Sequence, residues 1–139
     1  MPTIFSQIAA GEIPARVVYE DETTMAFLDA TPLAPGHTLV IPKDEYPRLN
    51  DVPADVANDL YATIHQLVPA VEAAVDADAS TVAFNNGEAA GQEVPHVHCH
   101  ILPRFEGDGG SNVHGIAGDL PDLSDDELDS IAEDIESRA

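Results

Sequence analysis

The stretch His96-Val97-His98-Cys99-His100-Ile101-Leu102-Pro103-Arg104 is the most informative part of this 139-residue chain. Its alternating pattern predicts a β-strand over residues 96–102. Because successive side chains on a strand point to opposite faces, His96, His98 and His100 would share one face, with neighbours ~6.6 Å apart. Imidazoles in such a row can contact a chain of phosphates and act as nucleophile, acid or base near neutral pH.

Alternating histidines on a strand can also hold zinc. Cys99 would point away from the histidines into the core, and no nearby carboxylate or cysteine completes a ligand set. The spacing therefore favours a site without metal, and a zinc hydrolase that uses the three histidines is the alternative.

The residues before this strand favour an anion site. Residues 85–95 read Asn-Asn-Gly-Glu-Ala-Ala-Gly-Gln-Glu-Val-Pro. Glycines let backbone N–H groups approach an anion closely, and Asn and Gln amides can donate to phosphate oxygens. Together with the histidines, the loop predicts a phosphate-binding site.

Outward from this strand, short strands are separated by one long helix. Helical spacing runs from Pro53 to Val75, and Pro69 is expected to kink or divide that helix. A short helix at residues 6–10 opens the chain, and a capping box at 124–127 begins a last helix. Further strands are predicted at residues 17–19, 24–28, 37–41 and 81–85, the first two as a hairpin. This order predicts an α+β fold with an antiparallel sheet in a single domain, 1–139.

The composition is strongly acidic, with 26 acidic and 5 basic residues and a formal net charge of −21. The 44% of hydrophobic residues in periodic runs predicts a folded chain rather than a disordered one. The charge argues against a general nucleic-acid binder. At ~1 M salt the Debye length is roughly 3 Å, so the charges would hardly repel one another, and a high-salt cytoplasm is the expected environment.

The location is expected to be cytoplasmic. No stretch approaches the ~20 apolar residues of a membrane-spanning helix, so no membrane partner is expected. The N-terminus carries no secretory pattern, and Cys99 is the only cysteine, so no intrachain disulfide can form.

The few cationic side chains cluster in the sequence, which suits a small anionic ligand. Arg16 and Arg138 lie well outside the two clusters. The first cluster contains His37, Lys43 and Arg48, and the second contains His96, His98, His100 and Arg104.

The histidine stretch, preceded by Gly91-Gln92-Glu93-Val94, resembles the signature of the histidine triad family, His-φ-His-φ-His-φ-φ with φ apolar. Residues 35–43 resemble the family's central strand and residues 5–14 its opening, so the resemblance runs from Thr3 to Arg104. Residues 105–139, an acidic loop and the C-terminal helix, are not diagnostic. The resemblance implies an α+β fold whose antiparallel sheet continues across a homodimer.

The resemblance also implies a mechanism and a purine nucleotide substrate. His98 attacks the α-phosphorus and forms a nucleotidyl-imidazole that water resolves. His96 orients His98, while His100 and His37 contact the phosphate. Asp29 holds the ribose hydroxyls. The family's base pocket corresponds to Ile4, Phe5, Ile8 and Phe27, and its phosphate site to Asn85, Gly91, Gln92 (through its side-chain amide) and Val94 (through its backbone).

The substrate is left partly open. A nucleoside phosphoramidate or an adenylated amine is favoured; a dinucleoside polyphosphate, or a regulatory role with little activity, is the alternative. Some relatives bind zinc at positions held here by Thr3, Ser6 and Glu45, together with the first triad histidine. Since three of the four ligands are absent, we expect no structural zinc and no cofactor.

Overall fold

The computed structural model describes residues 2–139 of the chain. Contacts divide it after Asp108 into two compact units, close to the end of the family resemblance at Arg104. No helix within residues 2–139 has the length and apolar character needed to cross a membrane.

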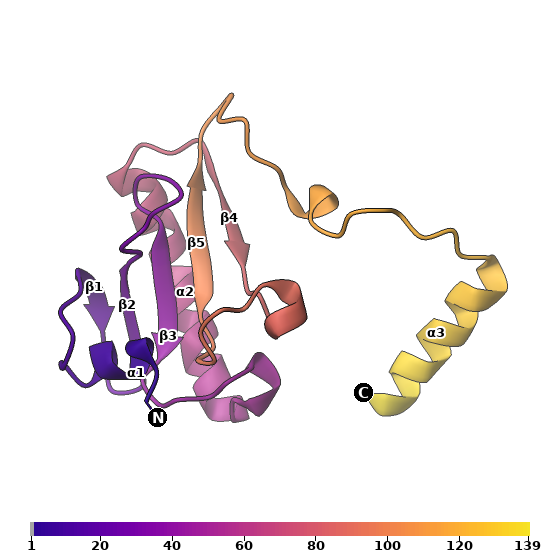
Figure 1. The fold of residues 1–139 in the computed structure, drawn as a ribbon, viewed down its shortest axis with the longest axis horizontal. Helices are drawn as coiled ribbons and strands as arrows, with labels where there is room; N and C mark the ends of the chain where they lie inside the picture. Colours follow the sequence, from indigo (N-terminus) through magenta and orange to yellow (C-terminus); the bar gives the residue numbers. More distant parts are fainter. Residues whose placement is uncertain (1) are drawn as a thin grey trace. The chain divides into compact units, whose positions relative to one another are not determined.

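The first unit is built on a five-stranded sheet with the order β1-β2-β3-β5-β4 (Figure 1). Every neighbouring pair is antiparallel, and β1 and β2 form the predicted hairpin. The α+β prediction is confirmed. The strands are β1 (Val17–Glu20), β2 (Thr24–Leu28), β3 (Thr38–Pro42), β4 (Ala79–Ala83) and β5 (Cys99–Arg104).

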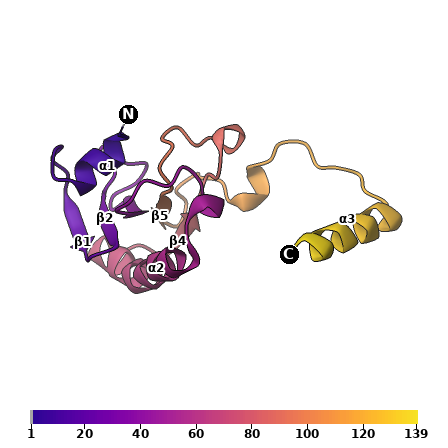
Figure 2. The same cartoon turned by 90° about the horizontal axis from the view of Figure 1, so that it is seen from below.

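Each face of the sheet is covered by a different helix (Figure 2). Helix α2 (Ala54–Ala74) packs Leu60, Ile64, Leu67 and Val71 against one face. Helix α1 (Ile4–Ala9) packs on the other face, where its buried side chains meet β2 and β3. Strands buried on both faces explain the apolar runs of β2 and β3. Single 3-10 turns occur at Leu49–Asp51, Glu88–Ala90 and Val113–Gly115.

Both helices of the first unit differ from the prediction. Helix α1 begins at Ile4 rather than residue 6, because the Thr3 side chain accepts a hydrogen bond from the Ser6 N–H and caps it. Helix α2 is not divided at Pro69, which lies inside one continuous helix. Leu67 and Val71, on either side of Pro69, both pack on the sheet and hold the helix together.

The prediction that the histidine strand begins at residue 96 is wrong, since β5 begins at Cys99. The His96 N–H bonds to Val94 O and the Val97 N–H to Tyr46 O, so a local turn and the 46–50 segment use these groups instead of a strand ladder. Strand β4 likewise ends at Ala83, which leaves Asn85 in the following loop. His96 and His98 therefore lie before the strand, and His100 lies within it.

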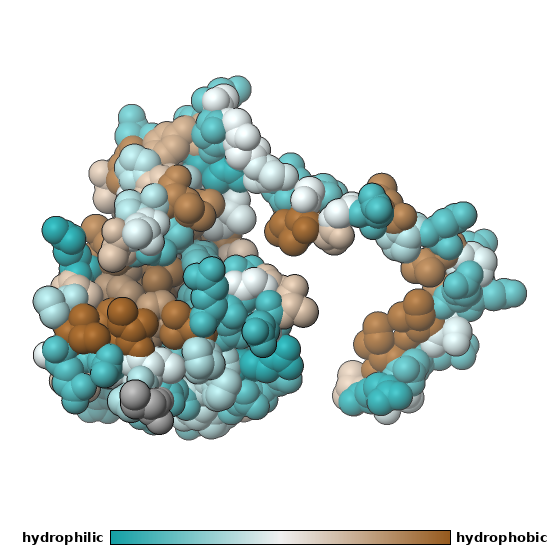
Figure 3. All heavy atoms as spheres, in the orientation of Figure 1, coloured by the Kyte–Doolittle hydropathy of each residue, from teal (hydrophilic) through white to brown (hydrophobic). Residues whose placement is uncertain are grey.

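The second unit, Gly109–Ala139, contains helix α3 (Asp125–Arg138). The predicted capping box is confirmed: Ser124 accepts from the Glu127 N–H, and the Glu127 carboxylate accepts from Ser124 N–H. The apolar side chains of α3, Leu128, Ile131 and Ile135, are all exposed along one side of it (Figure 3). None of residues 109–139 is buried.

Candidate active site

A cavity of about 630 Å³ lies where helix α1, strands β2 and β3 and the loop before β5 meet. All the site residues predicted from the sequence line it, except His96 and Gln92. The lining includes the apolar set Ile4, Phe5, Ile8 and Phe27, with Asp29, His37, Asn85, Gly91, Val94, His98 and His100.

The hydrogen bond of His98 fixes which of its ring nitrogens can react. His98 Nδ1–H donates to the carbonyl oxygen of His96 at 2.8 Å, so the neutral ring carries its proton on Nδ1 and keeps its lone pair on Nε2. The ring lies edge-on to Phe5, with centroids 4.9 Å apart, and the side chain is 8% exposed. The His98 ring is therefore fixed by its hydrogen bond and by Phe5, and its Nε2 has no hydrogen-bond partner among residues 2–139.

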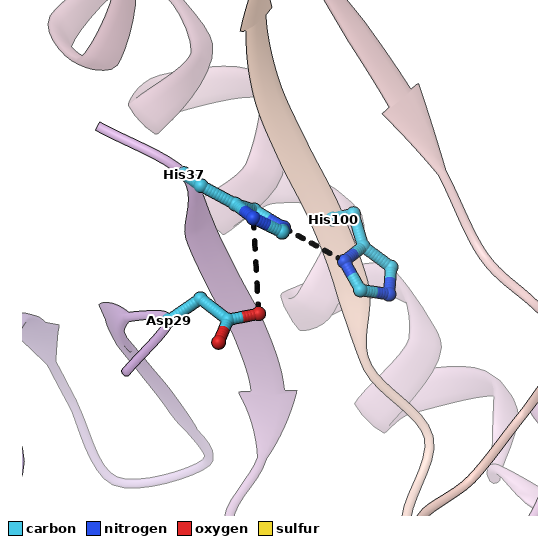
Figure 4. A group of neighbouring side chains, drawn as sticks. All are labelled: Asp29, His37 and His100. Atoms are coloured by element: carbon cyan, nitrogen blue, oxygen red, sulfur yellow. Dashed lines mark hydrogen bonds and ion pairs between the residues drawn. The ribbon is translucent and has the colours of Figure 1, made fainter. Parts of the chain in front are cut away.

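A short relay of hydrogen bonds sets the state of His37 and His100 (Figure 4). The Leu33 N–H donates to His37 Nδ1 at 3.1 Å, so the His37 proton resides on Nε2. This Nε2–H donates to His100 Nδ1 at 2.9 Å. His100 then carries its own proton on Nε2, where it can donate to an oxygen of a bound phosphate.

Burial keeps both of these histidines neutral. Burial lowers the pKa of His37, and the nearby Asp29 carboxylate opposes this only in part. Burial, with repulsion from His98 and His37, lowers the pKa of His100 to about 4. At neutral pH the pair therefore offers hydrogen bonds to a phosphate without carrying charge.

His96 lies behind the cavity rather than in it. Its Nε2–H donates to Pro42 O at 2.8 Å, and its Nδ1 accepts from the Thr3 hydroxyl at 3.1 Å. The ring is fully buried, and burial lowers its pKa. Because the carbonyl of His96 holds His98, anchoring the His96 ring also fixes the position of His98.

The residues at the zinc positions of some relatives form a hydrogen-bonded cluster here. Glu45 Oε1 accepts from the Thr3 N–H at 2.8 Å and from the Ser6 hydroxyl at 3.1 Å. The bond from Thr3 N–H lowers the pKa of Glu45. The cluster therefore ties helix α1 to the segment after β3 and to His96.

Gln92 braces the loop of residues 85–95 before β5, which the sequence predicts to bind phosphate. The Gln92 side-chain oxygen accepts from the Gly87 N–H at 2.7 Å, and its Nε2 donates to Pro47 O and Val94 O. Its amide, predicted to contact phosphate, is thus already engaged within the loop. Gly87 and Gly91 adopt φ of 99° and 95°, which favours glycine and lets the loop turn tightly.

Asp29 lines the cavity next to His37. Its Oδ1 accepts from the Thr31 N–H at 3.0 Å, and its Oδ2 lies 3.7 Å from His37 Nδ1. Within residues 2–139, Asp29, His37 and His100 are one group whose donor atoms lie close enough for a metal ion. Both ring nitrogens of His37 are already hydrogen-bonded, so the arrangement suits a relay better than a metal site.

The cationic side chains are placed differently from the sequence clusters. Lys43 pairs with Glu20 at 2.6 Å, and Arg104 pairs with Asp108 at 2.7 Å; neither lines the cavity. Arg16, which stands apart in the sequence, does line it. Lys43 and Arg104 are engaged by carboxylates away from the cavity, so closeness along the chain does not bring these cations to the site.

Some site residues carry no sequence signal of their own. The backbone N–H of Leu33 sets the His37 tautomer, and no residue pattern reveals a backbone donor. Thr3 could have been found as an N-cap, since Thr followed by an apolar run is a helix start.

Comparison with known proteins places this site in a family. The HIT domain model matches residues 10–107. The chain belongs to the histidine triad family. A HIT-like protein of Methanocaldococcus jannaschii is 48% identical over 106 residues, which is 76% of this chain and 81% of that protein. The crystal structure of a HIT family member from Bacillus subtilis has a TM-score of 0.89 at 34% identity and covers 100% of this chain and 98% of its own.

Two relatives have names that state an activity. An adenylylsulfatase of Arabidopsis thaliana is 39% identical over 105 residues, 76% of this chain and 53% of that protein. An asymmetrical bis(5′-nucleosyl)-tetraphosphatase of Schizosaccharomyces pombe is 37% identical over 108 residues, 78% of this chain and 58% of that protein. The histidine triad family therefore includes nucleotide hydrolases.

Proposed function

We propose that this protein is a nucleotide phosphohydrolase or nucleotidyl transferase that cleaves purine nucleotide derivatives at the α-phosphate through a nucleotidyl-His98 intermediate. One observation carries the proposal: the His96 carbonyl holds the proton of His98 on Nδ1, so the Nε2 lone pair is free beside the cavity. A neutral imidazole with a free nitrogen is a good nucleophile at neutral pH.

In the first step the Nε2 lone pair of His98 forms a bond to the α-phosphorus. The bond from phosphorus to the leaving group breaks, and its electron pair departs with the leaving group, which takes a proton from solvent if it is an amine. The Nε2–H of His100, oriented by His37, donates to a phosphate oxygen as negative charge builds there.

In the second step water attacks the same phosphorus. The bond between phosphorus and His98 Nε2 breaks, its electrons return to the imidazole, and the water proton passes to solvent. The products are a nucleoside monophosphate and free enzyme. An alcohol or amine in place of water would give a transferase by the same route.

The lining residues suit the parts of a nucleotide. The apolar side chains of helix α1 and Phe27 can enclose a purine base, and Asp29 can accept from the ribose hydroxyls. Asn85 and the backbone N–H of Val94 can donate to the phosphate. The Gly91 N–H already donates to Glu88 O at 2.9 Å, so Gly91 would contribute close approach rather than a hydrogen bond. These assignments, and the preference for a purine, belong to the proposal.

Assembly as a homodimer in the cytoplasm is also part of the proposal. The sheet has two outer strands, β1 and β4, and an unpaired strand edge is a surface on which two chains can join. We expect light scattering at high salt to give twice the chain mass. A monomeric mass would contradict the prediction that the sheet continues across two chains.

The experiment that tests the proposed function compares two matched substitutions. His98→Asn should abolish turnover of adenosine phosphoramidates and diadenosine tetraphosphate while nucleotide binding stays measurable, because only the nucleophile is lost. His65→Asn, on the exposed side of α2, should leave both unchanged. Near wild-type turnover by His98→Asn would refute the assignment, and binding without turnover in the wild type would indicate a regulatory role instead.

A further inference from the structure

Two carbonyl groups, at the end of β3 and just after it, hold the chain at His96. The His96 Nε2–H donates to Pro42 O at 2.8 Å, and the next N–H along the chain, that of Val97, donates to Tyr46 O at 2.7 Å. A third contact comes from a side chain, because the Thr3 hydroxyl donates to His96 Nδ1 at 3.1 Å. His96 has no exposed surface, so these three bonds fix its ring and its main chain.

The carboxylate of Glu45 places Thr3. Its Oε1 accepts from the Thr3 N–H at 2.8 Å and from the Ser6 hydroxyl at 3.1 Å. A hydrogen bond to a carboxylate is stronger than one between neutral groups. Glu45 therefore holds the main chain of Thr3 and the first turn of α1 while the Thr3 hydroxyl faces His96.

This series of contacts ends at the nucleophile of the proposed reaction. The His96 carbonyl accepts the Nδ1–H of His98 at 2.8 Å. His98 lines the nucleotide cavity, whereas Glu45, Thr3 and His96 do not. A change at Glu45 is therefore expected to reach the substrate through the placement of His98 and not through a direct contact.

We propose that Glu45 is a positioning residue for the nucleophile His98, acting through Thr3 and His96. The inference rests on the proposed function and adds to it a residue that touches neither the substrate nor the cavity. Attack on phosphorus requires a closely defined position of the nucleophilic nitrogen, which the groups behind it must maintain. Loosening this support should slow the chemical step more than it weakens nucleotide binding.

The kinetic test separates the chemical step from binding at one fixed neutral pH and salt concentration. With an adenosine phosphoramidate, Glu45→Ala should lower the single-turnover rate by about threefold to tenfold, as expected for the loss of one hydrogen bond. Calorimetry should give a Kd for AMP within about twofold of wild type. Glu45→Gln keeps a side-chain oxygen that can accept the same two bonds and should recover most of the rate. Failure of Glu45→Gln to recover it would overturn the inference.

Asp44 provides the matched control. It is the adjacent exposed carboxylate and takes part in none of these bonds. Asp44→Ala removes the same charge from the same segment and should keep the wild-type rate. In a double-mutant cycle, Glu45→Ala should slow the Thr3→Val variant little further, because the route to His96 is already cut. Independent losses that multiply would contradict a route through Thr3.

NMR of the imidazole nitrogens tests the placement of His98 without any turnover. In isotope-labelled protein the two neutral tautomers give different nitrogen shifts, and the His98→Asn spectrum identifies the His98 signals. Wild type, Asp44→Ala and Glu45→Gln should show His98 with its proton on Nδ1, and Glu45→Ala should show a mixture of both tautomers. If this shift occurs and no nucleotide is cleaved, the proposed function alone fails. Unchanged His98 nitrogen shifts in Glu45→Ala would overturn the inference and leave the proposed function intact.

Discussion

At the scale of single residues, two main-chain groups set the chemistry of the triad. The His96 carbonyl keeps the His98 proton on Nδ1, and the Leu33 N–H keeps the His37 proton on Nε2. The His37 tautomer passes on to His100, so in the proposed mechanism His98 Nε2 is the nucleophile and the His100 Nε2–H is the donor. Backbone hydrogen bonds thus fix the tautomers of His98 and His37.

Thr3 is expected to act on His98 through His96. Thr3→Val removes the hydroxyl that caps α1 and donates to the buried Nδ1 of His96. Unfolding measured with guanidinium should show a loss of about 2 kcal/mol, about 1 from the cap and about 1 from the unsatisfied nitrogen. Thr3→Ser keeps the hydroxyl and should restore most of the stability. Equal stability of the two variants would show that this hydroxyl does not hold His96.

The low pKa of His100 gives stability a defined pH dependence. The unfolded chain takes up a proton on this residue near pH 6.5, whereas the folded chain takes it up near a pKa of about 4. Between these values the unfolded state binds more protons, so the His100 contribution to stability falls as pH falls. The free energy of unfolding of wild type minus that of His100→Gln should therefore decline from neutral pH to pH 4. A flat difference would contradict a neutral, buried His100.

The residues predicted from the sequence differ in how well their roles could be foreseen. The histidines and the apolar pocket could be predicted because strand alternation and resemblance both mark them. The bracing role of Gln92 could not, since its amide reaches Pro47, far away in sequence. The place of Arg16 at the cavity could not be foreseen either, because the other lining residues lie far from it in the sequence.

At the scale of elements, helix α2 continues through Pro69 although the proline removes one helical hydrogen bond. Pro69 lacks the N–H that would bond to the His65 carbonyl, yet the helix continues to Ala74. The sequence predicted a kink or a division at Pro69, because local propensity alone does not include tertiary packing. The buried row from Leu60 to Val71 supplies the missing stability from tertiary contacts.

Replacing Pro69 should stabilise the protein. Pro69→Ala restores the missing helical hydrogen bond at an exposed position, and we expect a gain of about 1–3 kcal/mol in the free energy of unfolding. Pro53→Ala, at the N-cap of the same helix, should change it by less than about 0.5 kcal/mol. A loss of stability in Pro69→Ala would mean that the proline is required for the packing of α2.

The start of β5 shows what alternation can and cannot predict. The pattern from His96 to Leu102 correctly predicts that Cys99 and Ile101 pack in the core with α2, although His96 and His98 are buried too. It cannot show where the hydrogen-bond ladder begins, because that depends on a partner strand. Tyr46 takes the Val97 N–H, and the ladder starts only at Cys99, opposite Val40.

At the scale of the whole molecule, the net charge of −21 is expected to make stability depend on salt. Repulsion among the carboxylates favours the expanded, unfolded chain at low ionic strength. Screening shortens from ~30 Å at 0.01 M salt to ~3 Å at 1 M, which removes most of that repulsion. This is the basis for proposing a high-salt cytoplasm as the working environment.

Salt should affect stability and substrate binding in opposite directions. In a KCl series from ~0.01 M to ~1 M, Tm should rise steeply as repulsion is screened. The KM for an anionic substrate should rise too, because salt screens its attraction to Arg16 at the cavity. A Tm that stays flat across the series would contradict the high-salt proposal and leave the triad assignment unaffected.

The central claim is that His98 becomes covalently nucleotidylated. It is tested most directly by mixing the enzyme with an adenosine phosphoramidate, quenching at alkaline pH during turnover, and locating the added mass by peptide mass spectrometry. The account predicts one adenylyl group on His98 in the wild type and none in His98→Asn. An adduct on another residue, or full turnover with no adduct on His98, would contradict it.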